Sequence, residues 1–321
     1  MATQERVIPW LLATDPGVAW QVQRDLLDEP ENVWSGQRHR VETEGWGAEL
    51  LSHQDADGQW AGAAFWAAGF TREDWEREGQ PWTATCWALA QLREFGLDPA
   101  SPSARRTVEL VGANSRWEEG DQPYWEGEVE ECINGRTVAD GAYFGVDVAP
   151  MVERLVGELQ PDGGWNCERS NGSVRSSFDS TINVLEGLAE FERTSGGTPA
   201  SRAARAAGEE YLLERRLFRR LSDGRVVDPE YLQPASPHRW RYDVVRALDY
   251  FRSAATLDGR RPDPRLAEAA DIVRGLRWPD GRWRSERTVR GRSWLTMDAG
   301  VGQPSPWITL KALRVLRWLD A

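Results

Sequence analysis

Apolar residues recur every three or four positions in several stretches of this chain, which is the spacing of an amphipathic helix. Two such stretches are Val152–Leu159 and Leu266–Leu276. Two more, Asp179–Leu188 and Pro306–Leu316, open with residues that favour helix starts. Most faces are apolar over Thr181–Leu188 and Trp307–Leu319. Strand signals are sparse, so the pattern predicts an all-α protein.

A short phrase that ends in tryptophan separates these helices and recurs about every 50–60 residues, as a repeated supersecondary unit would. Its Asp-Gly pair favours a tight turn. The copies are Gln54–Trp60, Gln160–Trp165 and Trp278–Trp283, with a fainter one at Ser222–Val226. The repetition predicts five or six stacked helical hairpins.

The more apolar helix of each hairpin follows the turn, which suits an inner ring of helices enclosed by an outer ring. We therefore expect a closed (α/α) barrel, or toroid, with a central cavity. A helix capped by Asp15-Pro16 belongs to an N-terminal helical segment, residues 1–44, and the repeats span about 45–321. The expectation is a single domain over residues 1–321.

Composition excludes several functions. No apolar run reaches the 18 residues of a membrane span, and the net charge of −12 argues against nucleic acid and anionic membranes as partners. Cys86, Cys132 and Cys167 are too widely spaced for a disulfide framework. Because the N-terminus also lacks the pattern of a signal peptide, we expect a cytoplasmic protein.

Two residue types are used unusually. The chain has 18 tryptophans, most of which we expect to pack the repeats while the rest could line a pocket. It also has 38 arginines but only one lysine, Lys311, which we attribute to the codon usage of a GC-rich genome.

Aligning the second helices of the hairpins brings polar residues to their N-termini. The aligned position holds Thr85, Cys132, Thr181, Asp243 and Thr309, and the position two before it holds Thr83, Glu130, Asp179, Arg241 and Trp307. Converging helix N-termini favour anions, so a diphosphate or carboxylate group could bind there. Arg239 or Arg241 would clamp it, with Arg175 reaching from a loop. The alternative is that these residues cap helices and pair with one another.

The turn phrases at Gln54–Trp60 and Gln160–Trp165 resemble the QW motif of squalene-hopene and oxidosqualene cyclases. Asp-Gly-Gly-Trp, followed by a helix ending in Leu185–Leu188, is also similar to the repeat of protein prenyltransferase β subunits. The resemblance covers about residues 45–320. It implies the α/α toroid of the terpenoid cyclase and prenyltransferase superfamily, with a cavity for an isoprenoid or lipid-like substrate.

The cyclase resemblance implies an acid catalyst. Ser177–Ile182 matches the Asp-x-Asp-Asp-Thr-Ala motif, with Asp179 on the aspartate that protonates the substrate and serines at its two acidic neighbours. This implies proton-initiated cyclisation or isomerisation. Aromatic rings would stabilise the carbocation. The candidates are Trp82, Trp240 and Trp307, with Tyr242 in the same polar-aromatic stretch as Trp240. The alternative for Asp179 is a helix N-cap.

The prenyltransferase resemblance implies zinc, which those enzymes bind through Asp-x-Cys and a later His. Here Glu130-Glu131-Cys132 stands at the first position and Asp179 at the second, while Cys167 could supply another thiolate. This predicts a zinc-dependent transferase- or hydrolase-like enzyme; the alternative is that Cys132 is a buried free thiol. The candidate catalytic residues are therefore Asp179, Glu130 and Asp243. A third alternative is a non-catalytic toroid that serves as a binding or scaffold protein.

Overall fold

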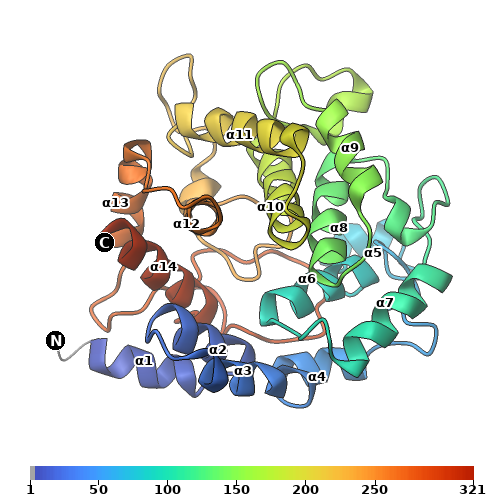
Figure 1. The fold of residues 1–321 in the computed structure, drawn as a ribbon, viewed down its shortest axis with the longest axis horizontal. Coiled ribbons are helices and arrows are strands. Elements are labelled where there is room, and N and C mark those ends of the chain that lie inside the picture. The colour runs from blue at the N-terminus through green and yellow to red at the C-terminus, as the bar shows by residue number, and fades with distance from the viewer. Residues whose placement is uncertain (1–3) are drawn as a thin grey trace. The chain divides into compact units, whose positions relative to one another are not determined.

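The computed structural model describes residues 4–321, and within that range it contains helices and isolated β-bridges but no β-strand (Figure 1). The prediction of an all-α protein is therefore confirmed. The α-helices are α1 (Gln4–Leu12), α2 (Pro16–Asp25), α3 (Glu31–His39), α4 (Gly45–Ser52), α5 (Arg72–Glu78), α6 (Thr85–Phe95), α7 (Pro102–Asn114), α8 (Glu131–Tyr143), α9 (Ala149–Gly157), α10 (Phe178–Ser195), α11 (Pro199–Glu214), α12 (Val244–Asp258), α13 (Ala267–Gly275) and α14 (Pro306–Leu319). None of these helices is long and apolar enough to cross a lipid bilayer.

The chain folds into two compact units, each made of more than one segment. Unit 1 contains the residues up to Arg38, together with Glu209–Val289 and Thr296–Ala321. Unit 2 contains His39–Gly208 and the short segment Arg290–Leu295.

The repeated turn has the same structure at each of its three strong copies. In each copy the tryptophan is fully buried and its ring N–H donates to a carbonyl ten residues earlier. These bonds are Trp60 to Leu50 at 2.8 Å, Trp165 to Leu155 at 2.7 Å and Trp283 to Val273 at 2.7 Å. Each tryptophan thus ties its turn to the helix before it.

A threonine ties each turn to the helix that follows it. The backbone N–H of the tryptophan donates to the threonine hydroxyl, at 3.1 Å for Trp60–Thr85, 3.1 Å for Trp165–Thr181 and 3.0 Å for Trp283–Thr309. The three threonines are those that the sequence alignment puts at one position. The turn phrase and the second helix therefore form one structural unit, built three times.

In unit 2, helices α8 and α10 pack unusually closely, side by side in Figure 1. Glycines allow this approach. A Cβ on Gly187 would lie 2.2 Å from the carbonyl oxygen of Gly135, and one on Gly135 would lie 2.6 Å from the Cα of Val184. Because the clashing atoms are backbone atoms, any larger residue would force the two helices apart.

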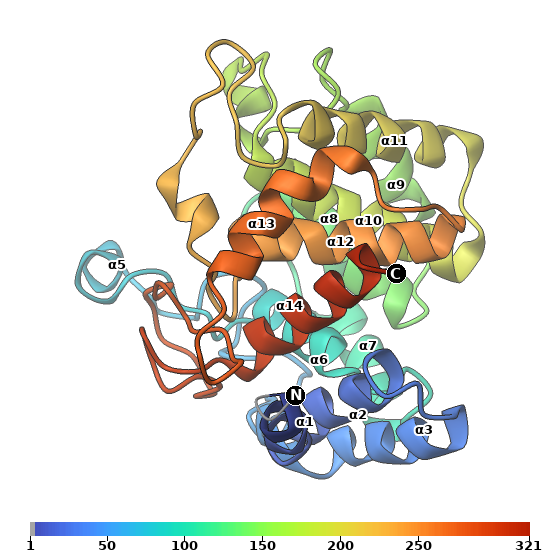
Figure 2. The same ribbon diagram turned by 90° about the vertical axis from the view of Figure 1, so that its left-hand side faces the viewer.

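In unit 1, a buried arginine joins three helices. Arg314 of α14 donates to Gln21 of α2 at 2.8 Å and forms ion pairs with Asp25 of α2 and Asp249 of α12. Although burial opposes the charged form of Asp249, the ion pair with Arg314 outweighs it and lowers the pKa of that carboxyl. Helices α12 and α14 contact each other and cross at an angle in the view of Figure 2.

The segment Arg290–Leu295 packs against the loop before α6. The backbone and ring N–H groups of Trp82 donate to the carbonyls of Arg292 and Arg290 at 2.8 and 2.7 Å, and the Trp294 ring donates to Thr83 at 2.8 Å. Gly291, at φ 132°, approaches Gln80 so closely that a Cβ would lie 1.7 Å from its carbonyl oxygen. Trp82 is therefore held as a packing residue of unit 2.

Candidate functional site

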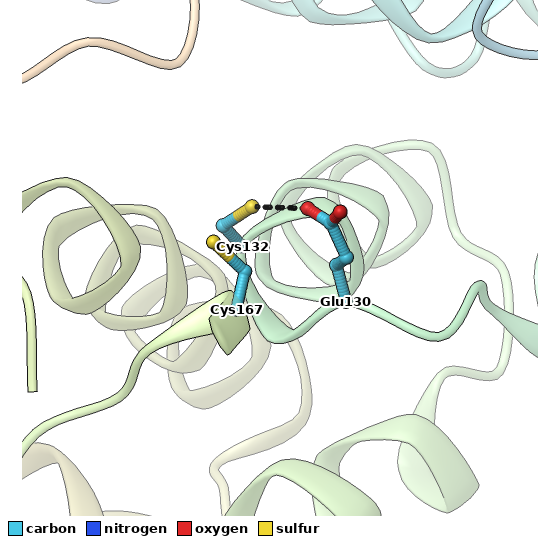
Figure 3. A group of neighbouring side chains, drawn as sticks. All are labelled: Glu130, Cys132 and Cys167. Atoms are coloured by element: carbon cyan, nitrogen blue, oxygen red, sulfur yellow. Dashed lines mark hydrogen bonds between the residues drawn. The ribbon is translucent and has the colours of Figure 1, made fainter. Parts of the chain in front are cut away.

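Three side chains that can bind a metal meet in unit 2. Glu130 is the N-cap residue of α8, Cys132 lies in the first turn of that helix, and Cys167 begins a short 3-10 helix, Cys167–Asn171. One ligand atom from each lies within 4.8 Å of the other two (Figure 3). The Cys132 Sγ is 3.4 Å from the Glu130 Oε2.

Local hydrogen bonds fix these residues. The backbone N–H of Cys167 donates to the Ser180 hydroxyl, at the start of α10, at 3.2 Å. Asn166 caps the 3-10 helix by accepting from the Glu168 N–H at 3.1 Å. The N–H of Glu130 donates to the Glu128 carboxylate at 2.6 Å. The starts of α8 and α10 thus hold the two halves of the cluster.

The cluster separates the acidities of its two thiols. A hydrogen bond from Cys132 lowers the pKa of Cys167 to about 7, and the Ser180 hydroxyl assists. The same hydrogen bond, together with burial, raises the pKa of Cys132. Burial also raises the pKa of the Glu130 carboxyl. Cys167 is therefore the thiol that ionises first, and thiolates are the form that binds metals.

The donor set suits zinc. In a tetrahedral zinc site a sulfur and an oxygen ligand lie about 3.6 Å apart and two sulfurs about 3.8 Å apart, given the usual bond lengths. The Cys132–Glu130 separation of 3.4 Å is close to the first of these values, and the 4.8 Å limit on the remaining pairs requires only small side-chain movements. Two thiols and one carboxyl also favour zinc over the hard cations, which prefer oxygen ligands.

Asp179 lies at the start of α10, next to Ser180, but it is not among the three grouped residues. Three of the four expected zinc ligands therefore lie together, and Asp179 is the one that does not join them. The alternative that Asp179 is the N-cap is wrong, because Ser177 has the extended backbone of a cap and accepts the Ser180 N–H at 3.0 Å. Asp179 lies in the first turn and is half-buried.

The remaining candidates of unit 2 do not join the cluster in the structure. Trp82 is buried and bonded to the segment Arg290–Leu295. Arg175 is exposed on the loop before α10, where its carbonyl accepts from the Asn166 side chain at 2.7 Å. Cys86 is buried, and burial raises the pKa of its thiol, so it lacks the acidity of Cys167.

The candidates of unit 1 lie around the start of α12. Asp243 is its N-cap and accepts the Arg246 N–H at 2.9 Å; burial raises the pKa of this carboxyl. The Tyr242 hydroxyl is buried and donates to the Leu217 carbonyl at 2.7 Å, which indicates a structural role.

The arginines that could clamp an anion are held differently from one another. The Arg241 guanidinium lies 4.5 Å from the centre of the Trp240 ring and 3.7 Å from Glu230. Arg239 is buried, with its backbone in the left-handed region at φ 55°. Arg241 therefore forms a surface pair, whereas Arg239 belongs to the core of unit 1.

Sequence reasoning missed Lys311. This residue is buried beside Trp307, and its Nζ is 3.4 Å from the Nδ1 of His238. Lys311, His238, Trp307 and Asp243 all line one small pocket of unit 1. The available signal was that Lys311 is the only lysine of the chain.

Comparison with known proteins adds little. No protein-family model matches the chain. No curated protein matches it either. A crystal structure of a protein from Actinoplanes is similar over 100% of this chain and 99% of that one, at 16% identity and a TM-score of 0.48. The function is therefore inferred from the site itself.

Proposed function

We propose that this protein is a zinc-dependent enzyme whose metal is bound by Glu130, Cys132 and Cys167. The observation that carries the proposal is the meeting of these three donors within 4.8 Å, from segments 35 residues apart in the chain (167 − 132). Zinc held by three protein ligands supplies Lewis acidity at an open fourth position, which is typical of catalytic zinc sites.

The chain's own residues would prepare this site. Cys167 is the more acidic thiol and would bind first as a thiolate, while the Ser180 hydroxyl stabilises that negative charge. Glu128 accepts the N–H of Glu130 and so orients the carboxylate ligand. Asp179, one residue before Ser180 at the start of α10, would be the acid that exchanges protons with a substrate there.

By its resemblance to the terpenoid cyclase and prenyltransferase repeats, we further propose that the fold is the α/α toroid of that superfamily. Its substrate would then be an isoprenoid or similar lipid-like molecule. The three equivalent turns at Trp60, Trp165 and Trp283 support the fold. The chemistry would be of the transferase or hydrolase type.

A second candidate function is proton-initiated cyclisation with Asp179 as general acid. It is favoured by the finding that Ser177 caps α10, so capping does not account for Asp179. The two candidates differ in their need for a metal, which makes metal content the measurement that separates them.

The test is the metal content of the untagged protein by mass spectrometry. We expect about one zinc per chain in the wild type. Cys132→Ala and Cys167→Ala should lose it, because each removes a thiolate ligand. The matched control is Cys86→Ala, which also removes a free thiol but lies outside the cluster. A wild type without metal would contradict the zinc proposal and leave Asp179 as the residue to examine, with isoprenoid diphosphates and squalene-like lipids as first ligands.

A further inference from the structure

Two of the three cysteines of the chain lie close together in the candidate metal cluster (Figure 3). The sulfurs of Cys132 and Cys167 are within 4.8 Å of each other, and both residues are half-buried. Cys86 is buried and lies outside the group. In redox-sensitive sites a small oxidant attacks one thiol and a neighbouring thiol then resolves the product as a disulfide. Cys132 and Cys167 have the arrangement that this chemistry requires.

The two sulfurs can reach bonding distance by a small movement. A disulfide holds its sulfurs about 2.05 Å apart, so Cys132 and Cys167 would approach by less than about 3 Å. Cys132 is fixed in the first turn of α8. Cys167 begins a short 3-10 helix whose other residues, Glu168–Asn171, are exposed. Gly172 ends that helix, and no atom lies within 4 Å of the place a Cβ would take there. The movement therefore falls to Cys167 and its exposed segment.

A disulfide and a bound zinc ion exclude each other at these residues. Zinc takes two separate thiolates, whose sulfurs lie about 3.8 Å apart around a tetrahedral ion. In a disulfide the same sulfurs are uncharged and about 2.05 Å apart. Oxidation of the pair would thus remove two of the three proposed ligands at once.

We propose that Cys132 and Cys167 are a reversible thiol–disulfide switch, which a peroxide closes and a thiol reductant reopens, and that closing it expels the metal. The expulsion rests on the proposed zinc function. The disulfide itself rests only on the positions of the two sulfurs.

The oxidation is balanced with hydrogen peroxide as the oxidant. The Cys167 sulfur attacks one peroxide oxygen, an S–O bond forms as the O–O bond breaks, and the leaving hydroxide takes the thiol proton to become water. The Cys132 sulfur then attacks the Cys167 sulfur. The S–S bond forms as the S–O bond breaks, and the second hydroxide leaves as water with the Cys132 proton. The two sulfurs lose two electrons and the peroxide gains them. When zinc is bound, solvent supplies the two protons and the ion leaves.

Peroxide treatment of the full-length protein, purified with its metal, tests the disulfide. Hydrogen peroxide is added together with dimedone, which traps sulfenic acids, and peptide mass spectrometry quantifies the products at each cysteine. We expect the linked Cys132–Cys167 peptides to exceed dimedone-labelled Cys167 by about tenfold or more, because the resolving thiol is already adjacent. Dithiothreitol should restore both thiols. Dimedone or sulfinic acid as the main product at Cys167, or thiols that survive a dose that fully oxidises glutathione, would overturn the proposal.

Two variants assign the roles of the cysteines. Cys132→Ser removes the resolving thiol and should raise the dimedone label on Cys167 about tenfold. An unchanged label would refute the order of attack. Cys86→Ala is the matched control and should form the Cys132–Cys167 linkage as the wild type does. Loss of the linkage in this variant would contradict a switch made of two cysteines.

A zinc-binding dye in the same wild-type samples measures metal release. We expect about one zinc released for each disulfide formed. A disulfide that forms while the zinc stays bound would overturn the expulsion. A protein that holds no metal but forms the disulfide would contradict the zinc function and retain the thiol pair. A protein that holds zinc but forms no disulfide would do the reverse.

Discussion

The hydroxyl of Thr181 shows how a single residue holds the repeated turn. It accepts the N–H of Trp165 at 3.1 Å and lies 3.4 Å from the carbonyl oxygen of the same residue, to which it donates. Both residues are fully buried, so water cannot replace these bonds. A buried backbone N–H left without an acceptor costs about 1–3 kcal/mol.

We therefore predict that Thr181→Val, which keeps the shape but removes the hydroxyl, lowers the free energy of unfolding by about 1–3 kcal/mol. Thr181→Ser is the matched control. It keeps the hydroxyl and loses only a methyl group, worth about 0.8 kcal/mol. Urea denaturation measures both. If the serine variant loses as much stability as the valine variant, the hydrogen bonds of this hydroxyl do not contribute the predicted free energy.

Single residues also mark the limits of sequence reasoning. Aligning the second helices predicts that Thr85, Thr181 and Thr309 are equivalent, although they follow their tryptophans by 25, 16 and 26 residues. The cap of α10 was not predicted, since Ser177 and Asp179 are both good cap residues and only the extended backbone of Ser177 decides between them. The burial of Lys311 likewise depends on a loop distant in sequence.

At the scale of helices, the contact between α8 and α10 connects packing to the candidate metal site. Glu130 and Cys132 stand at the start of α8, and Cys167 is hydrogen-bonded to Ser180 at the start of α10. The backbone contact of Gly135 with Gly187 sets the separation of the two helices. The geometry of the three donors therefore depends on residues that cannot bind metal.

We predict that Gly187→Ala destabilises the protein by about 1–3 kcal/mol, because the added methyl group has no space. The displaced helices should also bind zinc more weakly, as measured by competition with a chelating dye. Gly36→Ala is the control. Gly36 lies in the exposed part of α3 with no atom within 4 Å of the new Cβ, so alanine there should add about 0.5–1 kcal/mol. A stabilising effect of Gly187→Ala would contradict the packing argument.

The sequence predicts the presence of these helices well, but it predicts their ends less well. The apolar pattern of Asp179–Leu188 lies within α10, but that helix continues to Ser195. It stops there because Gly196 adopts the left-handed conformation at φ 83°. The grouping of Cys132 with Cys167 agrees with the zinc ligands that the prenyltransferase resemblance implies, whereas the exclusion of Asp179 from the group depends on side-chain positions that the spacing of residues does not define.

At the scale of the whole molecule, the toroid proposal makes a prediction about size. A compact chain of 321 residues has a radius of gyration of about 20 Å. We expect small-angle X-ray scattering of the monomer to give a value near this, because a closed ring is compact. An open solenoid of the same repeats would give a clearly larger value and would contradict the ring. Light scattering on the same sample establishes that the monomer is measured.

Closure of a ring lies beyond what repeated turns can predict. Each turn specifies the contact between one helix and the next along the chain, as Trp165 does between α9 and α10. Whether the last repeat meets the first depends on the sum of many small rotations between neighbours. The periodicity therefore predicts the unit of construction but not the final arrangement.

The segment Arg290–Leu295 affects how the protein folds during its synthesis on the ribosome. Unit 2 is otherwise complete at Gly208, yet the hydrogen bonds that join Trp82 and Thr83 to residues 290–295 can form only when that segment arrives. Synthesis proceeds from the N-terminus, at about 5–20 residues per second. Several seconds must therefore pass between the synthesis of the main part of unit 2 and the formation of these hydrogen bonds.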